Sequence, residues 1–285
     1  QENGDFYRRE RQMSVRNFVP TQWAKNIDKA LDEFLIAAEF CNQEYTGLVK
    51  QAGDQIRIQQ AIRPTITTTT DGKPITLSTP ETPDGTSMTM TMLQQSYYDF
   101  VVHDVDKAQA QGDLEAILKG EAVQGVANAM DKHIFELAKD NSVKKSGSTG
   151  VSGTTILGVI NTGLAELYKN NVPPNADIEI DISPAFHTVF LEAYEKLDTN
   201  NSEMIKKGIV GRYGFANVKM SNNIYNDGTD DYIVIRTKKA IAFAKPLTEV
   251  YAVDAGNAFG DRIKGFTLYQ AKIARPKEIY VIKAH

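Results

Sequence analysis

The apolar positions of this chain change their spacing several times, and each change predicts a different element. Between residues 113 and 139, an apolar residue recurs every three or four positions, which is the period of one helix face. The residues of this stripe are Leu114, Leu118, Ala122, Val126, Met130, Ile134 and Leu137. Asp104 or Asp113 would cap the start of a helix roughly 40 Å long. Because Gly120 and Gly125 lower its intrinsic stability, we expect it to depend on packing along its length.

A shorter helical pattern lies nearer the N-terminus. Pro20 and Thr21 offer a turn and an N-cap, and the apolar face that follows ends at Cys41. The apolar residues of this face are Trp23, Ile27, Leu31, Phe34, Leu35 and Ala38. We expect Cys41 to be a small buried apolar residue rather than a nucleophile. Residues 1–20 are charged and without period, which indicates either a frayed terminus or a segment that orders against another subunit.

The next region has the two-residue alternation of strands around a stretch rich in Thr and Pro. Residues 53–58 and 96–102 are the two strand patterns. Between them, two β-prone arms, Thr65–Thr70 and Met88–Met92, flank Asp-Gly turn signals and predict a long hairpin. Because the near arm is polar on both faces, the hairpin has little core of its own. A loop of this length is either disordered or functional.

The second half of the chain alternates helices with strands. The Gly- and Ser-rich stretch at 146–153 is expected to be a flexible joint, and Thr154 or Thr155 would cap the helix behind it. A second helix starts at Ser183 and Pro184, with proline at its first position. The other expected elements are a helix over 156–167 and strands at 178–182, 209–210, 218–220, 232–235, 240–244, 266–269 and 279–282.

Composition narrows the class of protein. The chain has 285 residues, of which 41% are hydrophobic and 24% are charged, as in folded globular domains. Its net charge of −4 argues against a protein that holds nucleic acid mainly by its own charge. A single cysteine excludes an internal disulfide framework and a multi-cysteine zinc site. With no apolar run of roughly 18 residues, no membrane span is predicted. The first residue, Gln1, leads us to expect a removed leader or a longer gene product.

Candidate catalytic and metal-binding residues are few. His103, Asp104 and Asp106 could supply metal ligands, but no second cluster completes a coordination shell, and Asp104 is more simply an N-cap. Ser183 and His187 are four positions apart, with neither an acidic partner nor a Gly-x-Ser-x-Gly turn, so nothing favours a catalytic triad.

Three further motifs have simple structural interpretations. The glycines between 147 and 155 lack the Gly-Lys-Ser/Thr ending of a phosphate-binding loop. The acidic run Asp227–Asp231 is typical of a turn between strands. His133 lies beside the apolar stripe of the long helix and is expected to be packed or half exposed. We therefore predict no catalytic, cofactor-binding or metal-binding residue.

The order of these parts resembles the major capsid protein of tailed double-stranded DNA bacteriophages, the Hong Kong 97-type shell fold. Local sequence is similar as well, most specifically Gly211–Phe215 followed by Val218–Asn223. The other similar stretches are Phe18–Trp23 leading to Cys41-Asn42, Gly53–Ile58 and Ser183–Phe186.

The resemblance implies an α+β fold with four parts: an N-arm, an extended β-hairpin called the E-loop, a P-domain with a long spine helix, and an α/β A-domain. The implied boundaries are 1–52 for the N-arm, 53–98 for the E-loop, 99–146 for the P-domain spine helix, 147–246 for the A-domain, 247–273 for the P-domain return strand, and 274–285 for the strand that closes the A-domain.

The function that this resemblance implies is structural and non-enzymatic. Copies of the chain would assemble as hexamers and pentamers into an icosahedral virion shell, which encloses double-stranded DNA without sequence-specific binding. Assembly would take place in the host cytoplasm, without a cofactor, and portal, scaffold and decoration proteins are further implied partners. Some members of the family crosslink a loop lysine to an asparagine, for which Lys73 and Asn257 are the nearest candidates.

Three alternatives stay open at this point. An encapsulin-like compartment would have the same fold and hold protein cargo. A soluble α/β hydrolase would use Ser183 and His187. A host-surface binding module would contact a receptor through the Thr-rich hairpin.

Overall fold

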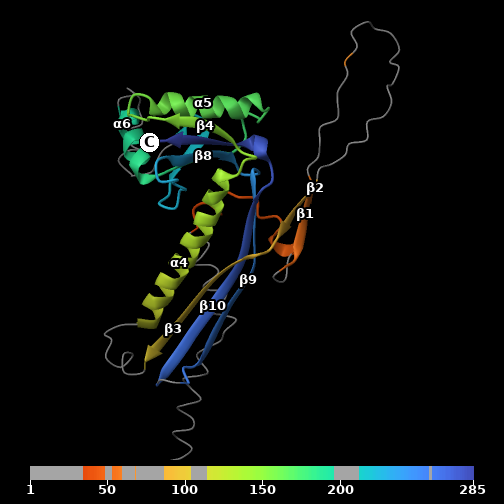
Figure 1. Cartoon of the computed structure of the whole chain (residues 1–285), viewed down its shortest axis with the longest axis vertical. Helices are drawn as coiled ribbons and strands as arrows, with labels where there is room; N and C mark the ends of the chain where they lie inside the picture. The colour runs from red at the N-terminus through yellow and green to blue at the C-terminus, as the bar shows by residue number, and fades with distance from the viewer. Residues whose placement is uncertain are drawn as a thin grey trace, which may run out of the picture.

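The computed structural model describes residues 35–48, 53–59, 68, 87–103, 114–195, 212–256 and 259–285. An α/β part lies at one end, and a long helix and a long sheet extend away from it (Figure 1). The described strands form a six-stranded, a three-stranded and a two-stranded sheet.

The α/β part is built on a mixed six-stranded sheet of order β4-β11-β8-β5-β7-β6. Its β4–β11 and β5–β7 pairs are parallel, and its other pairs are antiparallel. The strands are β4 (Lys144–Thr149), β5 (Ile178–Ile182), β6 (Arg212–Tyr213), β7 (Ala216–Met220), β8 (Asp231–Thr237) and β11 (Ile279–Ala284). Two helices, α5 (Ile156–Lys169) and α6 (Pro184–Glu195), pack on one face. On that face, isoleucines of β5, β8 and β11 meet the buried Ile156, Ile160 and Phe190 of the helices.

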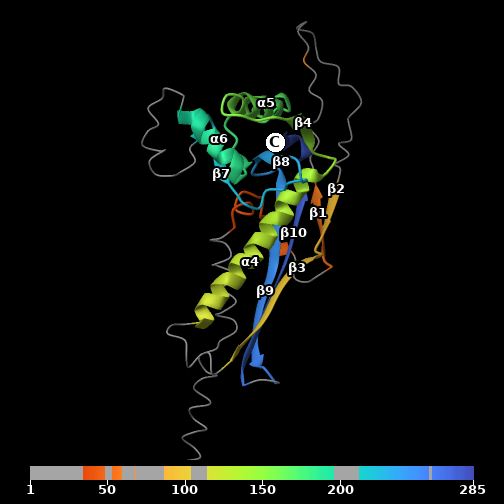
Figure 2. The same cartoon turned by 60° about the vertical axis from the view of Figure 1, so that its left-hand side comes forward.

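The long sheet is antiparallel, with β10 in the centre. It consists of β3 (Gln94–His103), β9 (Ile241–Asp254) and β10 (Gly260–Ile273). Helix α4 (Leu114–Glu136), continued by the 3₁₀ turn η2 (Leu137–Lys139), runs along one face of this sheet, as both views show (Figures 1 and 2). Val126, Met130 and Ile134 from the predicted stripe are buried in the shared core. The long helix is thus confirmed, and it packs against the sheet.

The other face of the long sheet carries a two-stranded ribbon, which consists of β1 (Gln55–Gln59) and β2 (Ser87–Thr91). The alternate residues Ile56, Ile58 and Met90 pack on β9 and β10 at the end nearest the α/β part. The strand pattern at 53–58 and the far arm of the predicted hairpin are confirmed. The far arm pairs with β1, a pairing that the sequence did not predict, whereas the near arm Thr65–Thr70 lies outside the described residues apart from Thr68. The apolar alternation of β1 matches that of β2, so both strands turn their apolar side chains to the same face.

Two predictions are corrected. The first half of the Gly- and Ser-rich stretch expected to be a joint, residues 146–149, belongs to strand β4, because the backbone of β11 supplies a parallel partner that local composition cannot reveal. The N-terminal helix was expected to reach Ala38, yet residues 36–41 form turns whose peptide groups bond to α4 and β8 instead. Short 3₁₀ turns, η1 (Thr46–Leu48) and η3 (Pro276–Glu278), complete the described elements.

The other predicted helices and strands of the second half are confirmed where the structure describes them. Helix α6 begins at Pro184, and Thr155 is at the N-cap position of α5, although its side chain makes no capping hydrogen bond. Several predictions concern residues outside the described ranges and stay predictions. These residues are 1–34, the near arm 65–70 apart from Thr68, the caps Asp104 and Asp113, Asp106, the strand at 209–210, and the crosslink candidates Lys73 and Asn257.

Candidate functional site

Residues 35–42, named here the N-terminal strap, lie where α4, the α/β sheet and the long sheet meet. Asn42 forms a one-residue parallel bridge to β9: its N–H donates to the Ile241 carbonyl at 2.8 Å, and the Phe243 N–H donates to its carbonyl at 2.9 Å. On the α4 side, the carboxylate of Asp131 accepts the N–H groups of Ile36 and Ala37, both at 3.0 Å. Burial raises the pKa of Asp131 to about 6, although these bonds favour its charged form.

On the sheet side, the strap covers Arg236 of β8, whose side chain is fully buried. Its guanidinium donates to two acids on the neighbouring strand β5: Nε to Asp181 Oδ2 at 2.8 Å, and Nη2 to Glu179 Oε1 at 2.9 Å. Arg236 and Glu179 are paired directly in the antiparallel register. The guanidinium group of an arginine has five N–H donors in one plane, so it can donate to several acceptors at once.

The remaining donors of Arg236 hold the strap itself. Nη1 donates to the Phe40 carbonyl at 2.9 Å and to Cys41 Sγ at 3.2 Å, and Nη2 donates to the Ala37 carbonyl at 3.1 Å. The guanidinium carbon also lies 5.5 Å from the centre of the Phe40 ring. One buried side chain therefore joins β5, β8 and a segment almost 200 positions earlier in the chain.

Among the acids around Arg236, Glu179 has the pKa that is shifted most. Its side chain is 1% exposed and lies 3.2 Å from Lys219 of β7, which also pairs with Glu39 of the strap at 2.7 Å. Burial, and next the charge of Asp181, raise the pKa of Glu179 to about 8, against the opposing effect of Arg236 and Lys219. Together these residues form an ionic cluster, defined here as Arg236, Glu179, Asp181, Lys219 and Glu39.

The sequence predicted that Cys41 is a small buried apolar residue, and the structure confirms this prediction. It is 1% exposed, and its thiol donates to the Ala37 carbonyl at 3.2 Å. Burial raises the pKa of the thiol to about 11, which keeps it in its unreactive protonated form near neutrality.

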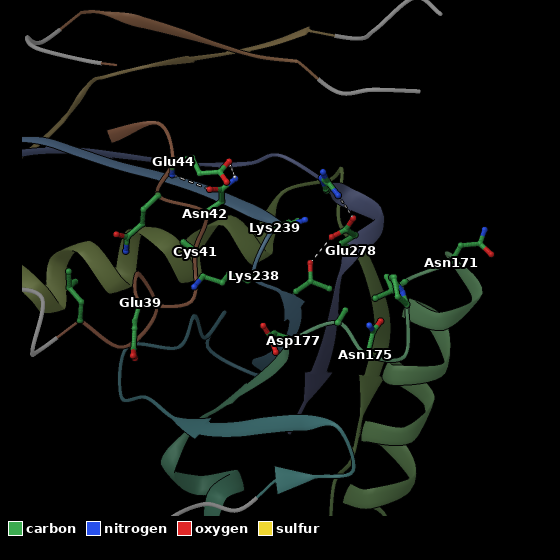
Figure 3. Close-up of a pocket in the computed structure, with 17 residues that line it drawn as sticks. Glu39, Cys41, Asn42, Glu44, Asn171, Asn175, Asp177, Lys238, Lys239 and Glu278 are labelled. Carbon is green, nitrogen blue, oxygen red and sulfur yellow. Dashed lines mark hydrogen bonds and ion pairs between the residues drawn. The ribbon is translucent and has the colours of Figure 1, made fainter. Parts of the chain in front are cut away.

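A cavity of about 930 Å³ lies beside the strap. Figure 3 shows Glu39 and Glu44 on the strap side, Lys238 and Lys239 on the turn between β8 and β9, and Asp177 just before β5. Acids and lysines are mixed along its wall, so no single charge sign favours one class of ligand.

The outer face of the long sheet, away from α4, carries exposed aromatic and aliphatic side chains beyond the ribbon. Tyr97 is 79% exposed on β3, and Tyr251 and Val253 are each 44% exposed on β9. Between them on β10, Arg262 pairs with Asp99 through Nε at 2.8 Å. We call this the outer face: Tyr97, Asp99, Val101, Arg262, Lys264, Tyr251 and Val253. Exposed apolar groups interleaved with charges are typical of protein–protein contact surfaces.

The structure does not assemble the serine–histidine pair into a triad. The Ser183 hydroxyl donates to Asp231 Oδ2 at 2.6 Å, and His187 Nε2 is buried with no hydrogen-bond partner in the described part of the chain. The hydroxyl thus points at an acid, and no imidazole is placed to take its proton.

The other histidines and acids singled out in the sequence form no catalytic or metal-binding group among the described residues. His133 is half-buried as expected, with its ring 5.8 Å from that of Tyr269. His103 is exposed at the end of β3. Asp227 accepts the N–H groups of Thr229 and Asp230 in the predicted turn. Within the described ranges, no three His, Cys, Asp or Glu side chains are grouped to hold a metal ion, and no helix is long and apolar enough to cross a bilayer.

Sequence reasoning missed the ionic cluster. A local signal existed, because Glu179 and Asp181 alternate with isoleucines in β5, and Arg236 ends an apolar run in β8. That pattern is typical of a strand with one solvated face. Only the strap, which is distant in sequence, turns the solvated face into a buried one.

No family model and no curated protein matches the chain. Solved structures match it along most of its length. One described as Mycobacterium phage Che8 is 24% identical, with a TM-score of 0.72 over 87% of this chain and 90% of that chain. The capsid structure of the cyanophage P-SCSP1u is 14% identical, with a TM-score of 0.67 over 88% of each. A virus-like particle from Pyrococcus furiosus is 10% identical, with a TM-score of 0.59 over 90% and 95%. At these identities, the likeness establishes a shared fold.

Proposed function

We propose that this chain, which has the Hong Kong 97-type capsid fold that the sequence predicted, is the major capsid protein of a tailed double-stranded DNA bacteriophage. The observation that carries the proposal is the extent of the match. The likeness covers nearly nine-tenths of this chain and of the phage chains it resembles, so neither has a large domain that the other lacks. The protein would act as a structural component of the virion shell and would catalyse no reaction.

The outer face supports this proposal physically. A long sheet whose outer side exposes Tyr97, Tyr251 and Val253 leaves apolar area in water that a neighbouring subunit can cover. In a closed shell, each such contact is repeated by symmetry, so individually weak contacts add up to a stable particle. The occupant of this face would be another copy of the same chain.

Each part of the fold would then have its own role in assembly. The A-domain (147–246) would surround the axis of hexamers and pentamers, and the E-loop (53–98) would lie over a neighbouring subunit. The N-arm (1–52) would tie adjacent capsomers. The net charge of −4 suits a wall that contains DNA without binding it tightly. Portal, scaffold and decoration proteins would be further partners.

Electron microscopy of the purified protein under assembly conditions tests the proposal. We expect closed particles of uniform diameter and megadalton mass by light scattering. A protein that stays monomeric or dimeric under all such conditions would refute the shell function. Particles from infected cells distinguish the two shell functions: a nuclease-protected DNA genome supports the virion shell, whereas packaged enzyme with no genome supports the encapsulin-like compartment.

A matched deletion tests the role of the E-loop. Gln59 and Ser87 are the last paired residues of the ribbon, so replacing residues 60–86 by Asn-Gly would close it with a two-residue turn and keep β1 and β2. We expect a folded subunit with wild-type unfolding that forms no closed shells. Normal shells from this variant would refute the role given to the E-loop while leaving the shell function intact.

A further inference from the structure

The strap and the ionic cluster depend on each other for burial. Arg236 donates to the carbonyls of Ala37 and Phe40, and both Arg236 and Glu179 are at most 1% exposed under this cover. If the strap lifted, water would reach the guanidinium and the carboxylates together. Docking of the strap is thus coupled to the ionisation state of what lies beneath it.

The charges in the cluster do not balance when every group is ionised. Of the fully buried groups, one cation, Arg236, lies between two carboxylates, those of Glu179 and Asp181. The second cation, Lys219, is 33% exposed and is shared between Glu179 and Glu39, whose own side chain is 69% exposed. One negative charge is therefore left over in a place where an uncompensated charge is costly. Asp181 Oδ1 is buried without a hydrogen-bond partner among the described residues, which is consistent with this shortage of donors.

Every element packed on the cluster contributes to this balance. Asp181 lies beside Glu179 on β5, Arg236 is on β8, and Lys219 is on β7. The strap contributes Glu39, which pairs with Lys219, and the Cys41 thiol, which contacts Arg236. From α4, Asp131 adds repulsion to Asp181, while its own charge is met by strap N–H groups.

We propose that the strap is a proton-gated latch: it stays docked while Glu179 carries a proton, and it opens more readily once Glu179 is ionised. The pH dependence of strap docking does not require the proposed shell function. Only the role of the latch in assembly rests on that function. There it would make the position of the N-arm dependent on the pH at which subunits meet.

The sign follows from proton linkage. In the docked state the pKa of Glu179 is about 8, and in an opened, hydrated state it returns toward its ordinary value of 4.5. Between these values the docked state binds more protons than the open state. Raising the pH across this interval therefore weakens docking by up to about tenfold per pH unit.

Cys41 reports the opening directly, because it is the chain's single cysteine and is a buried residue of the strap itself. The experiment measures iodoacetamide labelling of the full chain from pH 5.5 to 8.5, with each rate divided by that of the urea-unfolded chain at the same pH. This ratio removes the pH dependence of the thiolate itself. We expect the ratio to rise by up to about tenfold per pH unit and to level off above about pH 8.

Two variants complete the test. Glu179→Gln cannot ionise, so above the pKa of Asp131, which is about 6, its ratio should stay constant within about twofold from pH 6.5 to 8.5. Glu44→Gln, an exposed change just beyond the strap, should keep the wild-type slope. A flat wild-type ratio, or an unchanged slope in E179Q, would overturn the latch. If E179Q fails to fold, the wild-type ratio decides alone.

The latch and the shell function fail separately. Labelling is measured on unassembled subunits, so it gives a result even if no particles form. A flat ratio together with normal particles in the microscope would refute the latch alone.

Discussion

Arg236 and Glu179 face each other in register on adjacent antiparallel strands, with Nη2 2.9 Å from Oε1 and neither side chain more than 1% exposed. The pair is completed from outside the sheet, by carbonyl groups of a segment almost 200 positions away. The same guanidinium that forms this ion pair therefore also holds the N-terminal strap on the α/β part.

Replacing Arg236 by Met should destabilise the subunit by about 3–5 kcal/mol, because it leaves the buried Glu179 and Asp181 without their cation. Urea unfolding monitored by circular dichroism measures this. The control is Arg275→Met, which removes an exposed ion pair to Glu278 and should cost at most about 1 kcal/mol. A loss below about 1 kcal/mol in R236M would contradict the importance given to this contact.

The pH profile of stability should reveal Asp131. Because its folded-state pKa is raised from 3.8 to about 6, its contribution is fully present below pH 3.8 and is lost as the pH rises through 6. Relative to Asp131→Asn, the wild-type free energy of unfolding should fall by up to about 1.4 kcal/mol per pH unit between pH 4 and 6, and then level off. Urea titrations at four pH values test this. Asp177→Asn, at an exposed carboxyl, is the control, and parallel profiles for wild type and D131N would disprove the prediction.

Two glycines of α5 should respond in opposite directions to alanine. A Cβ on Gly163 would lie 2.5 Å from Ile235 Cδ1 and 3.2 Å from Ile282 Cδ1, so G163A should cost about 1–3 kcal/mol by overpacking. Gly158 is exposed with nothing near its Cβ position, so G158A should gain about 0.5–1 kcal/mol from helix propensity. Thermal unfolding of both variants checks this, and equal shifts would show that α5 does not press on the sheet at Gly163.

The outer face should matter for assembly and little for folding. The double variant Tyr97→Ser with Tyr251→Ser should stay within about 1 kcal/mol of wild-type stability, because both side chains are exposed. We expect it to remain a subunit by light scattering under conditions in which the wild type forms particles. Tyr168→Ser, at an exposed tyrosine on α5, is the matched control. Wild-type particles from the double variant would show that subunits meet through other surfaces.

Local pattern was enough to predict most elements. The stripe of α4 predicts its helix correctly because period and burial coincide there. The isoleucine alternation of β5 also predicts its strand correctly, although all five of its residues are buried. Local composition failed at β4, where a Gly- and Ser-rich stretch is ordered by a strand from the other end of the chain. It failed at the strap for the same reason, since Asp131 and Arg236 take up peptide groups that a helix would have paired within itself. The ionic cluster could not be predicted, because its burial depends on contacts between segments remote in sequence.

Because β9 and β10 are long, a small change of angle at the junction beside the strap moves their far ends by a large distance. Each strand has 14 residues, which at roughly 3.4 Å per residue makes a lever about 48 Å long. A tilt of about 5° where this lever meets the α/β part would move its far tip by roughly 4 Å. Angular error of that size, repeated in every subunit, changes the curvature at which a closed surface can form. A stiff, many-bonded junction would therefore help to set the radius of the particle.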